Sequence, residues 1–312
     1  MAPAERTTWS CPVCGGGQHR PAFRAGTRSL EQLDPSELAP AASAFGTTLG
    51  DTVRCRSCGH GSLRRVPSAE ELARTYAHVE DHASLDEEAG QVATARRDLR
   101  AVRALLTDAP GDLLDIGCWT GSLLDAARTL GWDTEGIEPS DWAAARAEER
   151  GHPVAVGTLG EVALRQERYQ VIACCDVLEH LVDPGDAVAR IAALLEPGGL
   201  LFATVPDAGS RLARALGHRW WSVLPMHVQY FTRSSLRSLL SRADLEVLSV
   251  RTHPKVFTRG YYADRLGEFV PGAGRPLERL AAIGSWADRP FAPDLRDRMA
   301  VIARRPVEEQ DR

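Results

Sequence analysis

Four cysteines near the N-terminus are spaced to bind a metal ion. Cys11 and Cys14 form one Cys-x2-Cys pair, and Cys55 and Cys58 form a second. Each pair can wrap two thiolates around one side of a tetrahedral ion, and zinc is the usual occupant of such a site. Because four thiolates leave no open position for a reacting water, we expect a structural metal that takes no part in chemistry.

The other cysteines and two histidines give weaker signals. A redox pair or unpaired thiols are the alternatives for the two Cys-x2-Cys pairs. His19 and His60 lie near the pairs in sequence; each is a surface or turn histidine by preference and an alternative ligand otherwise. Cys118, Cys174 and Cys175 lack ligand-like spacing, and we expect them to be buried thiols in or beside strands.

A glycine-bearing turn is the second chemical signal. An apolar run ends in Asp-x-Gly, from Asp115 to Gly117, and a further glycine follows at Gly121. We expect a strand that breaks into a tight turn, where the absence of side chains lets the backbone approach a ligand. A helix beginning at Ser122 would then direct its N-terminus at the bound molecule.

An acid follows at the spacing expected for nucleotide binding. Glu138 closes the next expected strand, and a carboxylate about twenty residues after the first glycine accepts hydrogen bonds from ribose hydroxyls. The nicotinamide dinucleotide fingerprint needs a middle glycine in the turn, and Trp119 stands there instead. The pattern therefore favours an adenosine cofactor other than a nicotinamide dinucleotide.

These residues resemble motif I of the class I S-adenosylmethionine-dependent methyltransferases, although Trp119 replaces the usual small residue. Residues 169–180, 194–202 and 220–232 resemble, in order, the family's fourth strand, its Pro-Gly-Gly turn with the fifth strand, and the block before the sixth strand. The resemblance implies an enzyme that transfers a methyl group from S-adenosylmethionine. The cofactor-binding residues that we expect are Asp115, Gly117, Cys118, Gly121, Glu138, Thr158, Leu159 and Asp176.

Two histidines are the candidate catalytic residues. His180 follows the fourth expected strand and His227 lies before the sixth, so both flank the crevice at the carboxyl ends of the strands. A neutral imidazole can accept a hydroxyl or carbon-acid proton. Bracing of the surrounding loop is the alternative role for each. The resemblance implies that Tyr76 is a lid aromatic, and packing is its alternative role. The aromatic group around His227 is suited to walling the substrate pocket, and core packing is an equal alternative: Trp220, Trp221, Tyr230 and Phe231.

A zinc ribbon in front of a methyltransferase core is similar to bacterial sugar and natural-product methyltransferases. The sugar C-methyltransferases typically show Tyr-x-Glu-His where this chain has Leu224 to His227, so O- or N-methylation of a small metabolite stays equally open. A ribosomal RNA methyltransferase with a zinc head is an alternative, but a net charge of −5 and a pI near 6.0 argue against nucleic acid. A non-catalytic interaction protein with a degenerate fold, its cofactor site blocked by Trp119, is another.

The intervening elements must position these residues. We expect α/β architecture: a mostly parallel sheet with helices on both faces and strands near 112–116, 133–138, 153–156, 170–175, 199–205, 245–251 and 299–303. The resemblance implies that the sheet is Rossmann-like, with seven strands and the last one antiparallel. Residues 1–65 would form the zinc ribbon, 66–110 a helical linker or lid with helices from Ser68 and over 91–106, and 111–306 the methyltransferase domain, with an insertion at 253–296. No secretory signal or membrane span is evident, so we expect a cytoplasmic protein. We expect it to be a monomer or a homodimer.

Overall fold

The computed structural model describes residues 9–38, 44–269 and 286–307, and its centre is a seven-stranded sheet. The strand order is β12-β15-β10-β9-β6-β7-β8. The strands are β6 (Asp112–Ile116), β7 (Asp133–Glu138), β8 (Val154–Val156), β9 (Tyr169–Cys175), β10 (Leu195–Pro206), β12 (Glu246–Thr252) and β15 (Arg298–Arg304). All seven predicted strands are confirmed, and the largest shift is at β10, which begins at Leu195.

The sheet is parallel except at one strand. Strands β8, β7, β6, β9 and β10 run in the same direction, and β15 lies antiparallel between β10 and β12, as predicted. From β6 the chain builds outward to β7 and β8, then returns to place β9 on the other side of β6. The order of strands therefore reverses between β6 and β9, which is where open α/β sheets bind ligands.

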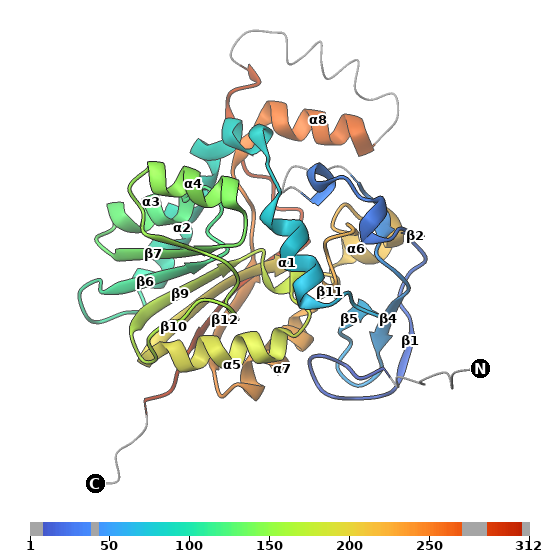
Figure 1. The fold of residues 1–312 in the computed structure, drawn as a ribbon, viewed down its shortest axis with the longest axis horizontal. Coiled ribbons are helices and arrows are strands. Elements are labelled where there is room, and N and C mark those ends of the chain that lie inside the picture. The colour runs from blue at the N-terminus through green and yellow to red at the C-terminus, as the bar shows by residue number, and fades with distance from the viewer. Residues whose placement is uncertain (1–8, 39–43, 270–285, 308–312) are drawn as a thin grey trace.

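Helices cover both faces of the sheet (Figure 1). Helices α2 (Glu88–Arg103), α3 (Ser122–Thr129) and α4 (Asp141–Glu149) lie on one face, and α5 (Pro184–Leu194) and α7 (Arg233–Arg242) lie on the other. Helix α2 begins three residues earlier than the range predicted, because the 3-10 helix η3 (His82–Glu87) runs directly into it. Each helix buries an apolar stripe against the strands.

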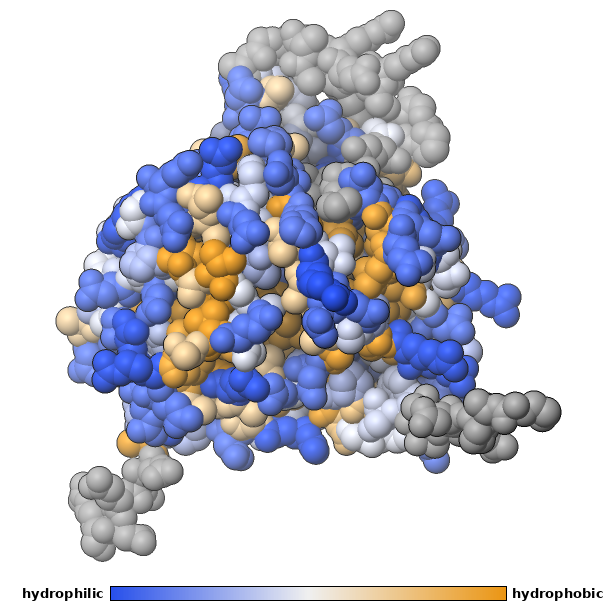
Figure 2. Space-filling view, in the orientation of Figure 1, coloured by the Kyte–Doolittle hydropathy of each residue, from blue (hydrophilic) through white to orange (hydrophobic). Residues whose placement is uncertain are grey.

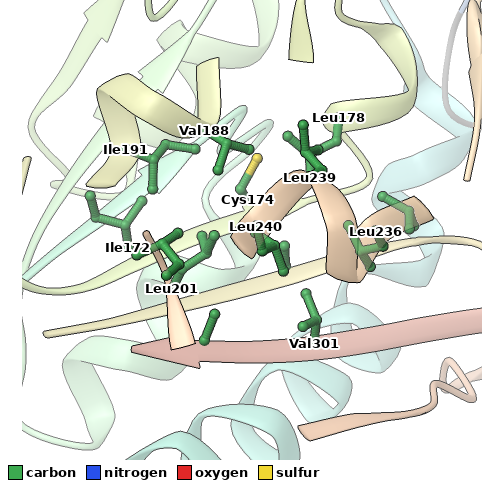
Figure 3. Packing of buried hydrophobic residues seen from close by; sticks show 14 of the residues in the cluster. Ile172, Cys174, Leu178, Val188, Ile191, Leu201, Leu236, Leu239, Leu240 and Val301 are labelled. Carbon is green, nitrogen blue, oxygen red and sulfur yellow. The ribbon is translucent and has the colours of Figure 1, made fainter. Parts of the chain in front are cut away.

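The core between the sheet and helices α5 and α7 is apolar at its centre (Figure 3). Val188 and Ile191 of α5 and Leu239 of α7 pack onto side chains of the parallel strands. Cys174 lies within this cluster and Cys118 lies in the core on the opposite face, so both are buried thiols as predicted; Cys175 is partly buried. This packing makes the sheet a rigid platform for the residues at its carboxyl edge.

The N-terminal residues form a small separate layer, which we call the cysteine module (residues 9–38 and 44–65). Strands β1 (His19–Pro21), β4 (Thr52–Cys55) and β5 (Gly61–Leu63) are antiparallel, and β2 (Gly26–Thr27) pairs with β3 (Thr47–Thr48). Two 3-10 turns, η1 (Leu30–Gln32) and η2 (Pro35–Leu38), lie between them. The module's sheet takes in a fourth strand, β11 (Gln229–Tyr230), from far along the chain. This shared sheet was not predicted.

The remaining elements surround the carboxyl edge of the large sheet. Helix α1 (Ala69–Ala77) has the predicted capping box between Ser68 and Glu71, and Figure 1 shows it between the sheet and the cysteine module. The other elements are η4 (Leu178–His180), α6 (Arg211–Leu216), η5 (Gly217–Arg219), β13 (Phe257–Thr258), α8 (Arg259–Phe269) and β14 (Pro290–Phe291). Residues 270–285 of the predicted insertion lie outside the described residues. Among the described helices, none has the length and apolar character needed to cross a membrane.

Candidate active site

A cavity of about 1240 Å³ lies at the carboxyl ends of the central strands. Its walls come from the turn after β6, from η4, from α1, from the cysteine module and from the segment after β12. Figure 2 shows apolar residues in the recessed centre of one face, with hydrophilic residues around them. The volume exceeds the range typical of a site for a single small ligand, roughly 300–1,000 Å³, and leaves room for a cofactor together with an acceptor.

The turn after β6 has the backbone that its glycines require. Gly117 has φ +71° and Gly121 has φ +87°, both in the left-handed region that favours glycine. A Cβ on Gly117 would lie 2.5 Å from Cγ2 of Val177, so the turn also needs glycine for space. Gly121 caps the N-terminus of α3 without a side chain and leaves that end of the helix open toward the turn.

Glu138 organises this turn from the end of β7. Its two carboxylate oxygens accept backbone N–H bonds from Trp119 and Ser140, each at 2.9 Å. The side chain is buried, and burial raises its pKa to about 7 against the opposing effect of the two N–H donors. Each oxygen keeps a second lone pair, so the carboxylate can hold the turn and still accept hydroxyl donors from a ribose.

Four other predicted cofactor residues have distinct surroundings. Asp115 is buried against the cavity, its Oδ1 has no hydrogen-bond partner, and burial raises its pKa well above the usual range. Cys118 packs under the turn, where a Cβ on Gly136 would lie 2.6 Å from its sulfur. Thr158 and Leu159 line the cavity after β8. These side chains surround one volume, and Asp115 offers it an unused acceptor.

Asp176 differs from the other predicted cofactor residues, because the protein's own cations occupy its carboxylate. It has φ +58° and forms ion pairs with Lys255 and Arg298. The hydroxyl of Thr204 donates to it at 3.2 Å. Burial alone would raise the pKa of Asp176, but Arg298 and Lys255 outweigh burial and hold it below its usual range. The carboxylate joins the ends of β9, β10 and β15.

His180 is braced on one side by a tyrosine from α1. The hydroxyl of Tyr76 lies 2.6 Å from Nδ1 of His180, and the carbonyl oxygen of Met226 lies 3.1 Å from the same nitrogen. Burial lowers the pKa of His180 to about 4, so the ring is neutral at neutral pH. Tyr76 therefore reaches the predicted histidine as well as the cavity.

His227 lines the cavity and has one ring nitrogen without a hydrogen-bond partner among the described residues. Its Nδ1 lies 2.8 Å from the carbonyl oxygen of Ser222. Since a carbonyl only accepts, this bond assigns the proton to Nδ1 and leaves a lone pair on Nε2. Among the described residues, His227 forms its side-chain hydrogen bond through Nδ1 only, and the side chain lines the cavity. Burial, with a smaller effect from His180, lowers the pKa of His227 to about 3. The lone pair is consequently available at neutral pH.

Glu179 is a site residue that the sequence reasoning missed. It is 1% exposed, and neither carboxylate oxygen has a hydrogen-bond partner. One of its oxygens and one nitrogen each of His180 and His227 lie within 4.8 Å of one another. Burial, with a smaller effect from Asp176, raises the pKa of Glu179 to about 8. The signal was present in the sequence as the middle residue of Leu-Glu-His, directly before the predicted histidine.

Of the two roles left open for the aromatic group, core packing applies to three rings and the pocket wall to one. Trp221 lines the cavity, but Trp220, Tyr230 and Phe231 are buried in packing clusters away from it. Trp220 donates from Nε1 to Asp297 at 3.0 Å and so acts as a core anchor. Consecutive residues around β11, from Val228 to Phe231, are all buried, which residue types alone did not indicate.

Trp119 contributes a ring in their place. It has φ +50°, and its indole Nε1 donates to Ser84 at 3.1 Å. The ring lines the cavity and lies 5.6 Å from the ring of Trp142. These partners hold the Trp119 side chain at the cavity wall, while its backbone N–H donates a hydrogen bond to Glu138.

The four N-terminal cysteines converge as a metal site would require. The Sγ atoms of Cys11 and Cys58 are 3.6 Å apart, as are those of Cys14 and Cys55, and all four lie within 4.8 Å of one another. A tetrahedral ion with zinc–sulfur bonds of about 2.3 Å places its sulfurs roughly 3.8 Å apart, so the cluster fits zinc.

The two halves of the cluster have the same local turn. Gly15 and Gly59 each follow the second cysteine of a pair, and both have left-handed φ, +73° and +76°. The alternative ligands lie elsewhere: His60 pairs with Gln229, and the ring of His19 packs beside Trp9. Four thiolates therefore make up the candidate metal site.

Comparison with known proteins agrees with this architecture. Residues 89–250, just over half of the chain, match the family model described as a methyltransferase domain. A ubiquinone biosynthesis O-methyltransferase from Burkholderia orbicola is 31% identical over 173 residues, which cover 49% of this chain and 75% of that protein. The C-methyltransferase NovU of Streptomyces niveus is 29% identical over 253 residues, which cover 78% of this chain and 57% of NovU.

Solved structures show the same fold. A chain from the complex between the Haloferax volcanii Trm112 methyltransferase activator and a methyltransferase aligns with a TM-score of 0.52 at 15% identity, over 72% of this chain and 95% of that chain. The glycine turn, the acid at the end of β7 and the sheet with one antiparallel strand thus agree with the match of the family model. The chain belongs to the class I S-adenosylmethionine-dependent methyltransferases.

Proposed function

We propose that this enzyme methylates an oxygen or a carbon atom of a small-molecule acceptor, with His227 as the proton acceptor. The observation that carries the proposal is the free Nε2 of His227, a residue that lines the same cavity as the glycine turn and Glu138. The names of two relatives, an O-methyltransferase and a C-methyltransferase, support this choice of acceptor atoms. Because the chain spans only 57% of NovU, that protein's whole activity is not carried over.

The cofactor would be held by the carboxyl edge of the sheet. Glu138 is the candidate for the ribose hydroxyls, Asp115 offers its unpartnered Oδ1 to a donor, and Gly117 lets the backbone come close. S-adenosylmethionine supplies a methyl group already activated on a sulfonium, so the protein mainly aligns the acceptor and removes its proton.

His227 and its neighbours would manage the acceptor's proton. As the bond from the acceptor atom to the methyl carbon forms and the carbon–sulfur bond breaks, the acceptor's proton passes to Nε2 of His227. The bond from Nδ1 to Ser222 holds the ring in the required tautomer. Glu179 lies beside the two histidines. In its ionised form, the Glu179 carboxylate would stabilise the imidazolium of His227.

The experiment incubates the protein with S-adenosylmethionine and a panel of nucleotide sugars, glycosides and phenolic or amino metabolites. Mass spectrometry should detect the gain of one methyl group in at least one oxygen or carbon acceptor. With that acceptor, His227→Ala should lower kcat by roughly 10²- to 10⁴-fold, the usual contribution of a general base. Affinity for S-adenosylhomocysteine should stay nearly unchanged.

His218→Ala is the matched control, because His218 is an exposed histidine in the same segment. It should keep wild-type turnover. Full turnover in His227→Ala would show that alignment alone drives the transfer and would remove His227 from the catalytic role.

A further inference from the structure

One strand joins the cysteine module to the candidate acceptor site. Strand β11 begins two residues after His227 and pairs with β5 of the module, Gln229 opposite Ser62 and Tyr230 opposite Gly61. Figure 1 shows β11 beside β5, away from the seven-stranded sheet. The segment that carries His227 is therefore a strand of the module's sheet, although it lies more than 160 residues away in sequence.

Val228 connects three segments through its backbone. Its N–H donates to the carbonyl oxygen of Glu179 at 2.9 Å, and its own carbonyl oxygen accepts the N–H of Leu63 at 3.0 Å. Val228 directly follows His227, and Glu179 directly precedes His180. A shift of β5 would thus move both histidine-bearing segments together.

The side chain of Gln229 makes a second connection. It is 1% exposed, and its Oε1 lies 2.9 Å from Nε2 of His60, two residues after Cys58. Its Nε2 donates to the carbonyl oxygens of Leu181 at 2.9 Å and Val182 at 3.2 Å, just after His180. Because an amide oxygen only accepts, His60 must donate from Nε2. The buried amide of Gln229 therefore connects the segment after Cys58 to the segment after His180.

The cofactor half of the cavity is built differently. The bonds of Glu138 to Trp119 and Ser140, and the bond from Gly117 N–H to the carbonyl oxygen of Ile137, all lie within the β6 and β7 region. None of these bonds involves the cysteine module. The hydrogen bonds that hold the two halves of the cavity consequently come from different parts of the fold.

We infer that the cysteine module is a positioning device for methyl transfer, and that Gln229 is its principal positioning residue. With a metal bound, the two Cys-x2-Cys pairs would hold β5 and His60, these would hold β11 and Gln229, and together they would fix the loops that carry His180 and His227. The inference rests on the proposed function of His227 as the proton acceptor. It predicts that loss of the connection reduces methyl transfer and leaves cofactor binding intact.

The first test compares Gln229→Leu with Arg56→Ala. Arg56 is an exposed residue between Cys55 and Cys58, and its side chain takes no part in the hydrogen bonds of Gln229, so its variant is the matched control. Gln229→Leu should lower kcat by at least about tenfold, because misplacement by an ångström costs up to roughly a hundredfold. Its dissociation constant for S-adenosylhomocysteine should stay within about twofold, and its metal content should equal that of the wild type. Unchanged kcat, or equal losses of kcat and cofactor affinity, would overturn the inference.

A second pair of variants separates positioning from general stability. His60→Leu removes the donor to Gln229, whereas His60→Gln retains a donating amide at that position. His60→Gln should recover part of the kcat lost in His60→Leu at similar thermal stability. Equal kcat in the two variants would contradict a role for this hydrogen bond.

The third test does not depend on turnover, so it stands even if His227 is not the base. Hydrogen exchange is measured with and without a chelator on peptides covering residues 224–231 and residues 112–117. Metal removal should accelerate exchange in the first peptide, where Val228 N–H is bonded, and leave the second protected. Unaltered exchange in residues 224–231 after metal loss would show that the module does not hold the acceptor segment.

Discussion

Single residues at the site owe their chemistry to burial. His227 keeps a lone pair on Nε2 because burial disfavours its protonated form, and Glu179 has a raised pKa for the corresponding reason on the acid side. The sequence predicted His227 and His180, because both follow motifs at the carboxyl edge of the sheet. It could not predict which nitrogen of each ring is occupied, since the partner atoms are main-chain carbonyls that carry no residue signature.

The lowered pKa of His227 predicts a loss of stability in acid. The folded-state pKa is about 3 and the unfolded value is near 6.5, so below pH 6.5 the unfolded chain binds the proton more readily. Stability is therefore fully present above pH 6.5 and falls as the pH decreases toward 3, by up to about 1.4 kcal/mol per pH unit for this one group. Urea denaturation followed by tryptophan fluorescence should show a smaller decrease between pH 7 and pH 5 in His227→Gln than in wild type. Identical pH dependence in the two proteins would refute this attribution.

At the scale of elements, the turn after β6 is organised from a neighbouring strand. Its glycines and the acid at the end of β7 were predictable, because backbone conformation and ribose binding demand those residue types at those spacings. The addition of β11 to the module's sheet was not, since two residues carry too weak a periodic signal to specify a pairing partner so distant in sequence. For the same reason the sequence left Tyr230 and Phe231 open between the pocket wall and the core, and they lie in the core.

Glu138→Gln tests the organisation of this turn. A glutamine has only one acceptor oxygen, so either the N–H of Trp119 or that of Ser140 loses its buried partner. We expect a decrease of about 1–3 kcal/mol in the free energy of unfolding and at least about tenfold weaker binding of S-adenosylhomocysteine by calorimetry. Glu135→Gln is the matched control on the same strand, where the side chain pairs with Arg168 and Tyr169 away from the cavity. Equal affinity in the two variants would show that Glu138 does not organise the turn.

At the scale of the whole molecule, two layers meet at one cavity. The class of the fold and the seven strands were predictable, because alternating apolar strands and amphipathic helices specify an open parallel sheet. The way the cysteine module shares a strand with the acceptor segment depends on tertiary pairing, which the spacing of Cys11, Cys14, Cys55 and Cys58 does not encode.

The cysteine cluster predicts one metal ion per chain. Protein purified without added zinc should contain close to one equivalent of zinc per chain by elemental mass spectrometry. X-ray absorption should show four sulfur neighbours around the zinc at about 2.3 Å. Cys11→Ser with Cys58→Ser should lose the metal and the protection of β4 and β5 against hydrogen exchange, because the binding energy of such a site is folding energy. A metal content near zero in a wild-type protein whose module is folded would refute the zinc site.

The most direct test of this enzyme's assignment is a calorimetric titration with S-adenosylhomocysteine. The wild-type protein should bind one equivalent per chain with micromolar affinity. Gly117→Arg should abolish binding, because any Cβ at that position meets Val177 and the backbone there has left-handed φ. Arg56→Ala, at an exposed position of the cysteine module, should bind as the wild type does. A folded wild-type protein that gives no binding heat would contradict a cofactor-dependent methyltransferase and would leave Trp119 as a residue that blocks the site.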